Sequence, residues 1–169
     1  MKVVMKKRQV FYSFHYKPDN WRASQVRNIG VIEGNSPVSD NEWETVKKGG
    51  DYAIERWIDS QMEYRSCTVV LVGRNTANRR WINYEIAKSW NDGMGVVGIR
   101  IHGLKDSDRH ISLLGGNPFD YVEFNNGKKL SSVVKCYNPQ GRSSIERYIW
   151  IKKHISNAVE EAIKIRKRN

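Results

Sequence analysis

The chain has 169 residues, of which 28% are charged and 39% hydrophobic, and its formal net charge is +11. This length suits one domain with a full core, residues 1–169, and the composition is that of a folded chain rather than a disordered one. The sequence has no apolar run near the ~18 residues of a membrane span, no secretory signal, and no disulfide spacing between Cys67 and Cys136. We therefore expect a cytoplasmic protein without a membrane partner.

The basic excess gathers at the two ends of the chain, within residues 1–8 and 164–169. Basic proteins attract polyanions, so nucleic acid is one partner to consider. A charge run at a chain end is more often a solvated tail, and positive charge also suits the two phosphates of a dinucleotide. We therefore expect two basic tails and regard nucleic acid as the less favoured partner.

Hydrophobic periodicity predicts strands that alternate with helices. A continuous apolar run over residues 67–73 is typical of a strand buried on both faces of a parallel sheet. Further strands are predicted over residues 9–14, 30–33 and 95–101, with an edge strand near 130–137. Helices are predicted from a cap at Asp19 or Asn20 to Ile29, from Asn41, from a cap at Asp51 to Met62, over 78–91, and from Ser144 onward.

The connecting segments include two long loops and one short turn. Residues 34–40 are rich in turn-forming residues, and a loop of that length often covers a functional site, although it can equally be an insertion. Residues 103–116 are polar and punctuated by glycine, and residues 117–121 are predicted to form a tight turn held by aromatic side chains. The segment at 34–40 is our candidate cover for a site.

Alternating strands and helices predict an α/β fold with a mostly parallel sheet, and ligands of such sheets bind outside the carboxyl ends of the strands. The loops after the first strand and after the buried strand, residues 14–19 and 74–80, are expected at that edge. The second loop leads into Trp81 and Glu85, which lie four residues apart and so share one helix face.

Each of these residues also has an ordinary explanation. Glu85 alone is a solvated helical glutamate, paired with Lys88 or Arg80, and Trp81 alone is a core residue. His15 alone is a polar loop residue. Their predicted convergence at one sheet edge, beside a long loop, favours a site for a flat cationic ligand.

Several other patterns predict no chemistry. Residues 93–98 match G-x-G-x-x-G, but they lead from a helix into a strand, whereas a dinucleotide fingerprint follows a strand and opens a helix. The histidines and cysteines have no metal-ligand spacing, so no metal is expected, and no nucleophile elbow is present.

Three blocks carry a family resemblance, namely residues 10–16 (VFYSFHY), 78–86 (NRRWINYEI) and 117–121 (NPFDY). In order and spacing they resemble the TIR-like ThsB proteins of bacterial Thoeris antiphage systems. The W-x-x-x-E spacing of Trp81 and Glu85 resembles the catalytic segment of NAD-cleaving TIR domains. Many of those domains have an arginine just after the first strand, where this chain has His15 and Tyr16.

The resemblance implies a flavodoxin-like, three-layer TIR-type fold with a long C-terminal helix, and cleavage of NAD at the nicotinamide–ribose bond. NAD is then a substrate and not a cofactor, and the ADP-ribose is released as a cyclic signal that activates a separate NAD-degrading effector. Glu85 carries over as the catalytic glutamate, and Phe14, His15, Tyr16 and Trp81 as NAD-contacting residues. Self-association is a further expectation.

The chemistry fits this expectation. Cleavage gives an oxocarbenium-like transition state that one carboxylate can stabilise, while Trp81 or Phe14 could stack on the cationic nicotinamide. The alternative is a non-catalytic TIR or flavodoxin-like module that signals by protein contact, with Glu85 on the surface.

Overall fold

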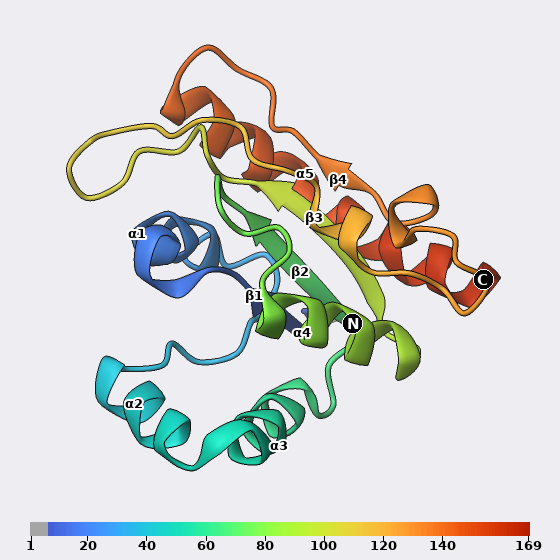
Figure 1. Cartoon of the computed structure of the whole chain (residues 1–169). Helices are drawn as coiled ribbons and strands as arrows, with labels where there is room; N and C mark the ends of the chain where they lie inside the picture. Colours follow the sequence, from blue (N-terminus) through green and yellow to red (C-terminus); the bar gives the residue numbers. More distant parts are fainter. Residues whose placement is uncertain (1–6) are drawn as a thin grey trace, which may run out of the picture.

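The computed structural model describes residues 7–169, and its centre is a parallel sheet in the order β1–β2–β3–β4 (Figure 1). The strands are β1 Val10–Ser13, β2 Cys67–Val72, β3 Gly95–Arg100 and β4 Cys136–Tyr137. Every residue of β2 is buried, which confirms the predicted central strand. Because apolar clusters lie on both faces of β2, its sequence is apolar at consecutive positions instead of alternating ones.

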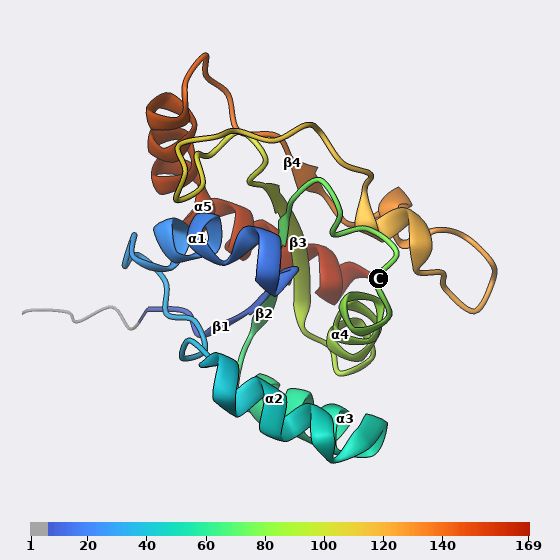
Figure 2. The same cartoon turned by 60° about the vertical axis from the view of Figure 1, so that its left-hand side comes forward.

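Helices form a layer on each face of the sheet (Figures 1 and 2). One layer contains α1 Tyr16–Arg27 and the long α5 Ser144–Arg168, and the other contains α4 Arg80–Asn91 with the 3₁₀ turns η1 Pro118–Tyr121 and η2 Leu130–Ser132. The helical hairpin of α2 Asp40–Lys48 and α3 Gly50–Met62 packs beside β1 through α3. The expected three-layer α/β fold with a long C-terminal helix is confirmed.

The topological switch point of the sheet lies at β1. Gln9, directly before β1, forms an isolated parallel bridge with Glu33. The Val10 N–H donates to the Glu33 carbonyl, whereas the Gln9 carbonyl accepts from Ser66 just before β2, so Glu33 and β2 lie on opposite edges of the chain where β1 begins. The prediction of a strand over residues 30–33 is wrong, since only Glu33 forms a bridge. The reason is that the backbone N–H of Tyr12 donates to Oδ1 of Asn35 at 2.9 Å instead of to a strand carbonyl.

The first helix begins earlier than its sequence predicts. His15 is the N-cap of α1, so residues 14–19 are mostly helix and Asp19 is a buried helical residue, not the cap. Pro18 is compatible with this start because the first turn of a helix has unpaired N–H groups and therefore tolerates proline. The predicted cap at Asp51 is also wrong, since α3 begins at Gly50.

The basic C-terminal residues are part of the folded structure. The expected tail is wrong here because α5 continues to Arg168 and buries Ile165. The guanidinium of Arg166 stacks on the Trp90 ring at 4.6 Å, and its Nε donates to the Trp90 carbonyl at 2.9 Å. At the other end, Arg8 pairs with Glu160 at 2.7 Å, and residues 1–6 of the expected N-terminal tail lie outside the described residues.

The structure of the later segments agrees more closely with the predictions from the sequence. The tight turn predicted at residues 117–121 is confirmed as η1, which Asn117 caps and which buries Phe119. The edge strand predicted near 130–137 is reduced to β4, since its first part forms η2. Among the helices formed by residues 7–169, none has the length and apolarity to cross a membrane.

Candidate active site

A cavity of about 1350 Å³ opens at the switch point, beyond the carboxyl ends of β1 and β2. Residues of α1, α2, α3 and α4 form its walls. All the site residues predicted from the sequence line this one cavity, namely Phe14, His15, Tyr16, Trp81 and Glu85. The structure thus brings together residues from two segments about seventy positions apart, as parallel-sheet topology predicts.

Glu85 is buried on the inner face of α4. Its neighbours Ile82 and Ile86 pack toward the sheet and fix the rotation of the helix, which leaves the Glu85 side chain 8% exposed. The hydroxyl of Ser13 donates a hydrogen bond to Oε1 of Glu85 at 3.3 Å. Burial raises the pKa of Glu85 well above its ordinary value of 4.5, and the Ser13 hydrogen bond lowers this pKa by a smaller amount.

The ordinary explanation of Glu85 is wrong. Lys88 pairs with Asp92 at 2.7 Å, and Arg80 pairs with Asp51 at 2.6 Å, so neither supplies a counter-ion to Glu85. A buried carboxyl without a cationic partner is costly, and such groups concentrate at functional sites. A cation bound beside Glu85 would offset this cost by favouring the carboxylate.

His15 lies just after β1, between Phe14 and Tyr16 in the sequence. The rings of Phe14 and Tyr16 stack with their centroids 6.2 Å apart. Nδ1 of His15 is buried and has no hydrogen-bond partner among residues 7–169. Burial and the nearby charge of Arg79 lower the pKa of His15 below 6.5, so the imidazole is neutral at pH 7 and can donate or accept a hydrogen bond.

Trp81 has both a core role and a place in the cavity wall. It is half-buried and packs against the cluster of Phe11 and Ile58, which joins β1 to α3. The guanidinium of Arg80 lies over its ring at 4.6 Å, and Tyr84 meets it edge-on at 5.8 Å. Because Arg80 lies on the ring, a cationic ligand could stack on Trp81 only from the opposite face or by displacing Arg80.

The cavity is basic and aromatic, with few carboxylates. Its acidic side chains are Glu44 and Glu85, and Glu44 pairs with Lys47 at 3.0 Å. The basic side chains are Lys17, Arg27, Lys47, Arg74, Arg79 and Arg80, and the aromatic ones are Phe11, Tyr12, Phe14, Tyr16, Trp43, Trp57, Trp81 and Tyr121. This composition suits a ligand with aromatic rings, anionic groups and one cationic part near Glu85.

The loop predicted as a cover is a wall of the cavity. Its residues Asn35 and Val38 line the cavity, and the hydroxyl of Tyr16 donates to the Val38 carbonyl at 3.2 Å. Gly34 lies so close to Tyr12 that a Cβ there would overlap the tyrosine ring. These contacts hold the beginning of the loop against β1.

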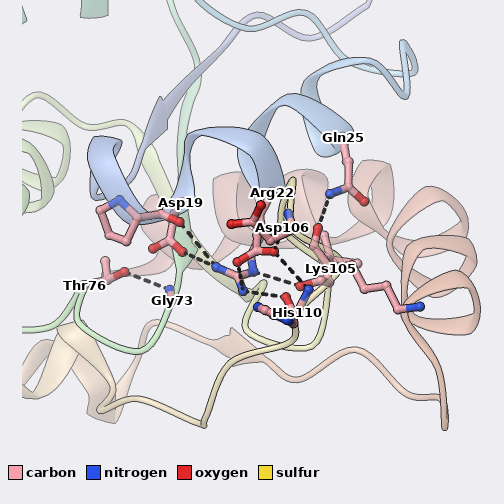
Figure 3. Close-up of polar contacts among 11 residues, drawn as sticks. Asp19, Arg22, Gln25, Gly73, Thr76, Lys105, Asp106 and His110 are labelled. Carbon is pink, nitrogen blue, oxygen red and sulfur yellow. Dashed lines mark hydrogen bonds and ion pairs between the residues drawn. The ribbon is translucent and has the colours of Figure 1, made fainter.

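A buried arginine of α1 holds the loop that follows β3 (Figure 3). Nε of Arg22 donates to the Leu104 carbonyl at 2.8 Å and Nη2 donates to the His110 carbonyl at 2.9 Å, while Nη1 contacts Asp19 at 3.3 Å. The segment held in this way continues to Gly116, which lines the cavity. The Asp19 carboxylate in turn lies directly against Gly73 at the end of β2, where a Cβ would overlap it.

Sequence reasoning missed Ser13, Arg27 and Asn35. Ser13 had a signal, because it is the polar last residue of an otherwise apolar strand, β1. Arg27 and Asn35 had no sequence signal, because their positions in the cavity depend on the course of a helix and of a loop, respectively. No group of three or more histidine, cysteine or acidic side chains within residues 7–169 is arranged to hold a metal.

The sheet, the layers of helices and the cavity at the switch point are those of a TIR-like domain. A family model described as "Thoeris protein ThsB, TIR-like domain" matches residues 11–106, which is more than half of the chain. The chain belongs to this family. A relative from Bacillus cereus (strain MSX-D12), named "Putative cyclic ADP-D-ribose synthase ThsB1", is 39% identical over an alignment of 131 residues. The alignment covers 73% of this chain and 68% of the relative.

Proposed function

We propose that this protein cleaves the nicotinamide–ribose bond of NAD and cyclises the ADP-ribose into a signalling nucleotide. The observation that carries the proposal is the buried Glu85 carboxyl, which meets Ser13 at the end of β1 in a cavity that is otherwise basic and aromatic. The similarity to a protein named as a cyclic ADP-ribose synthase supports the same class of product.

The chemistry requires one carboxylate. When the bond from the ribose C1′ to the nicotinamide nitrogen breaks, its electron pair stays on the nitrogen and nicotinamide leaves as a neutral molecule. Positive charge then moves from the ring to the ribose, where an adjacent carboxylate stabilises it. The cationic nicotinamide would also lower the pKa of Glu85 on binding, so the substrate would promote the ionised form that catalysis needs.

Cyclisation requires that an internal nucleophile of ADP-ribose reach C1′ before water does. Asn35 and Val38 of the loop at residues 34–40, and Gly116 at the end of the segment that Arg22 holds, line the cavity and would restrict the access of water to it. NAD is a substrate in this scheme, and the product would act as a diffusible signal for a separate NAD-degrading effector. The non-catalytic alternative requires a solvated Glu85, and the burial of this residue favours the enzyme.

The proposal is tested by incubating the protein with NAD and separating nicotinamide and cyclic products by chromatography. Wild type should release nicotinamide, and Glu85→Gln should lower the rate at least a hundredfold, because the amide cannot carry the opposing charge. The matched control is Glu63→Gln, since Glu63 is exposed at the end of α3 and does not line the cavity.

The assay is run with purified protein and also in phage-challenged bacteria that carry each variant. The second setting detects an activity that requires a trigger from the phage. Equal release by wild type and Glu85→Gln would remove Glu85 from its role. Absence of release in both settings would overturn the proposal.

A further inference from the structure

A second unusual charge in the cavity is Arg27, the last residue of α1. Its guanidinium lies 5.1 Å from the centre of the Phe14 ring and 5.9 Å from that of Tyr12, so two aromatic side chains hold it in place. The side chain is half-buried, unlike the exposed Lys17, Arg74, Arg79 and Arg80 around the same cavity.

Arg27 lacks the partners that a half-buried arginine ordinarily has. Its Nε is buried and has no hydrogen-bond partner among residues 7–169. Burial lowers the pKa of Arg27 below its ordinary value, and no carboxylate is among the groups that act on this pKa. The cost of removing this cation from water is therefore not offset by an anion of the described chain.

Arg22, one helix turn and a half earlier, shows what a structural arginine looks like in this fold. Its guanidinium donates to the carbonyls of Leu104 and His110 and contacts the Asp19 carboxylate, so its buried donors are used within the protein. Among residues 7–169, α1 thus contains one arginine whose donors are bound within the protein, Arg22, and one whose buried Nε has no hydrogen-bond partner, Arg27. Arg27 lines the cavity, so a ligand bound there could reach its guanidinium.

The positions of Arg27 and Glu85 match the charges of one ligand. Ser13 and Tyr12 are consecutive in β1 and so point to opposite faces of the strand. Ser13 contacts Glu85, whereas the Tyr12 ring contacts Arg27, so the carboxyl and the guanidinium lie on opposite sides of the end of β1 within one cavity. A molecule that passes over this end would meet a carboxylate on one side and an unpaired guanidinium on the other.

We propose that Arg27 is an anion-binding residue that holds the pyrophosphate of the ligand whose other end reaches Glu85. The inference rests on the proposed function for the identity of that ligand as NAD. A guanidinium suits phosphate because its planar set of N–H donors can form two parallel hydrogen bonds to phosphate oxygens. The contacts with the Phe14 and Tyr12 rings restrain the guanidinium before the ligand binds, which lowers the entropy cost of binding.

The test is a calorimetric titration with ADP-ribose, which has the pyrophosphate but no nicotinamide and therefore needs no cleavage. Arg27→Met should weaken ADP-ribose binding about ten- to a hundredfold, because it removes charge-assisted hydrogen bonds. Arg27→Lys should recover part of the affinity, since the charge remains. Adenosine, which has no phosphate, should bind wild type and Arg27→Met equally.

The matched control is Arg56→Met. Arg56 also lies over a tyrosine ring, that of Tyr52 at 5.7 Å, but it is exposed on α3 and does not line the cavity. Its replacement should leave ADP-ribose affinity unchanged, and thermal unfolding of each variant checks that it is folded.

Unchanged ADP-ribose affinity in folded Arg27→Met would overturn the inference, and so would equal losses of ADP-ribose and adenosine affinity. Failure of wild type to bind ADP-ribose would overturn it as well. These outcomes are separate from the proposed function, which nicotinamide release by wild type and Glu85→Gln decides.

Discussion

The hydroxyl of Ser13 donates a 3.3 Å hydrogen bond to Oε1 of Glu85 and so connects the end of β1 to α4. This contact favours the carboxylate form of Glu85, whereas burial, the larger effect, favours the protonated form. The balance of the two sets the pH at which Glu85 ionises in the empty cavity. It therefore connects the geometry of the switch point to the pH dependence of the proposed reaction.

Replacement of Ser13 with alanine should move the acidic limb of the pH–rate profile for nicotinamide release to higher pH. Without the hydrogen bond, the pKa of Glu85 rises further, and the shift should be up to about one pH unit, or about 1.4 kcal/mol. The rate should fall at low pH and stay near the wild-type value at high pH. Ser24→Ala is the control, because the Ser24 hydroxyl bonds within α1 to the Trp21 carbonyl. A uniform loss of rate at every pH would contradict this role of Ser13.

Glu85→Gln should be more stable than wild type at pH 8, although it is expected to be inactive. The folded protein raises the pKa of Glu85 above 4.5, so it binds a proton that the unfolded chain has lost. The stability contributed by this group is complete below pH 4.5 and decreases as the pH rises through the folded pKa. Glutamine does not titrate, so the stability advantage of the variant should grow from pH 4.5 to pH 8. Urea unfolding at both values measures the difference, and an advantage that is the same at both would show that Glu85 ionises normally.

The sequence predicted the fold wherever burial alone decided the structure. The apolar run that became β2 and the periodic face of α5 have large hydrophobic signals, and both elements were predicted near their actual bounds. Two of the errors occurred where side-chain contacts decided the structure. The Asn35 side chain accepts the Tyr12 N–H, so the pairing with β1 does not continue beyond Glu33. Arg166 donates to the Trp90 carbonyl, so it belongs to the folded structure and not to a solvated tail.

The candidate site was predictable in part for the same reason. Strand ends of a parallel sheet must meet at one edge, so Phe14 and Glu85 could be placed together from topology alone. The lack of an ion pair between Glu85 and either Lys88 or Arg80 could not be predicted. These two residues pair with other carboxylates, and that choice depends on side-chain positions. Arg27 lies at the far end of α1, where only the path of the helix brings it back to the Phe14 ring.

Arg22→Met should lower the free energy of unfolding by roughly 3 kcal/mol or more. The variant leaves the buried Asp19 without its cation and the Leu104 carbonyl without the donor that Arg22 supplies, while the His110 carbonyl keeps the N–H of Asp106. Amide hydrogen exchange should also accelerate across residues 103–116, because Arg22 holds this segment. Urea unfolding and exchange by mass spectrometry measure the two effects.

The control for this prediction is the double variant Asp19→Asn/Arg22→Met. It removes the buried charge that the single variant leaves unpaired, and it should recover part of the lost stability. If Arg22→Met is as stable as wild type, Arg22 does not hold the segment of residues 103–116.

Gly34→Ala should destabilise the protein by about 1–3 kcal/mol and raise the KM for NAD more than it changes kcat. A Cβ at this position would overlap the ring of Tyr12, which is 3% exposed and cannot move aside, so residues 34–40 must shift. The shift would break the bond from the Tyr12 N–H to Asn35 and displace Val38 from the cavity wall. Gly116→Ala is the stability control, because a Cβ there would meet its nearest neighbour, Ala77, at an acceptable 3.4 Å. Thermal unfolding and steady-state kinetics measure the two effects, and wild-type stability in Gly34→Ala would show that the loop is not fastened to β1.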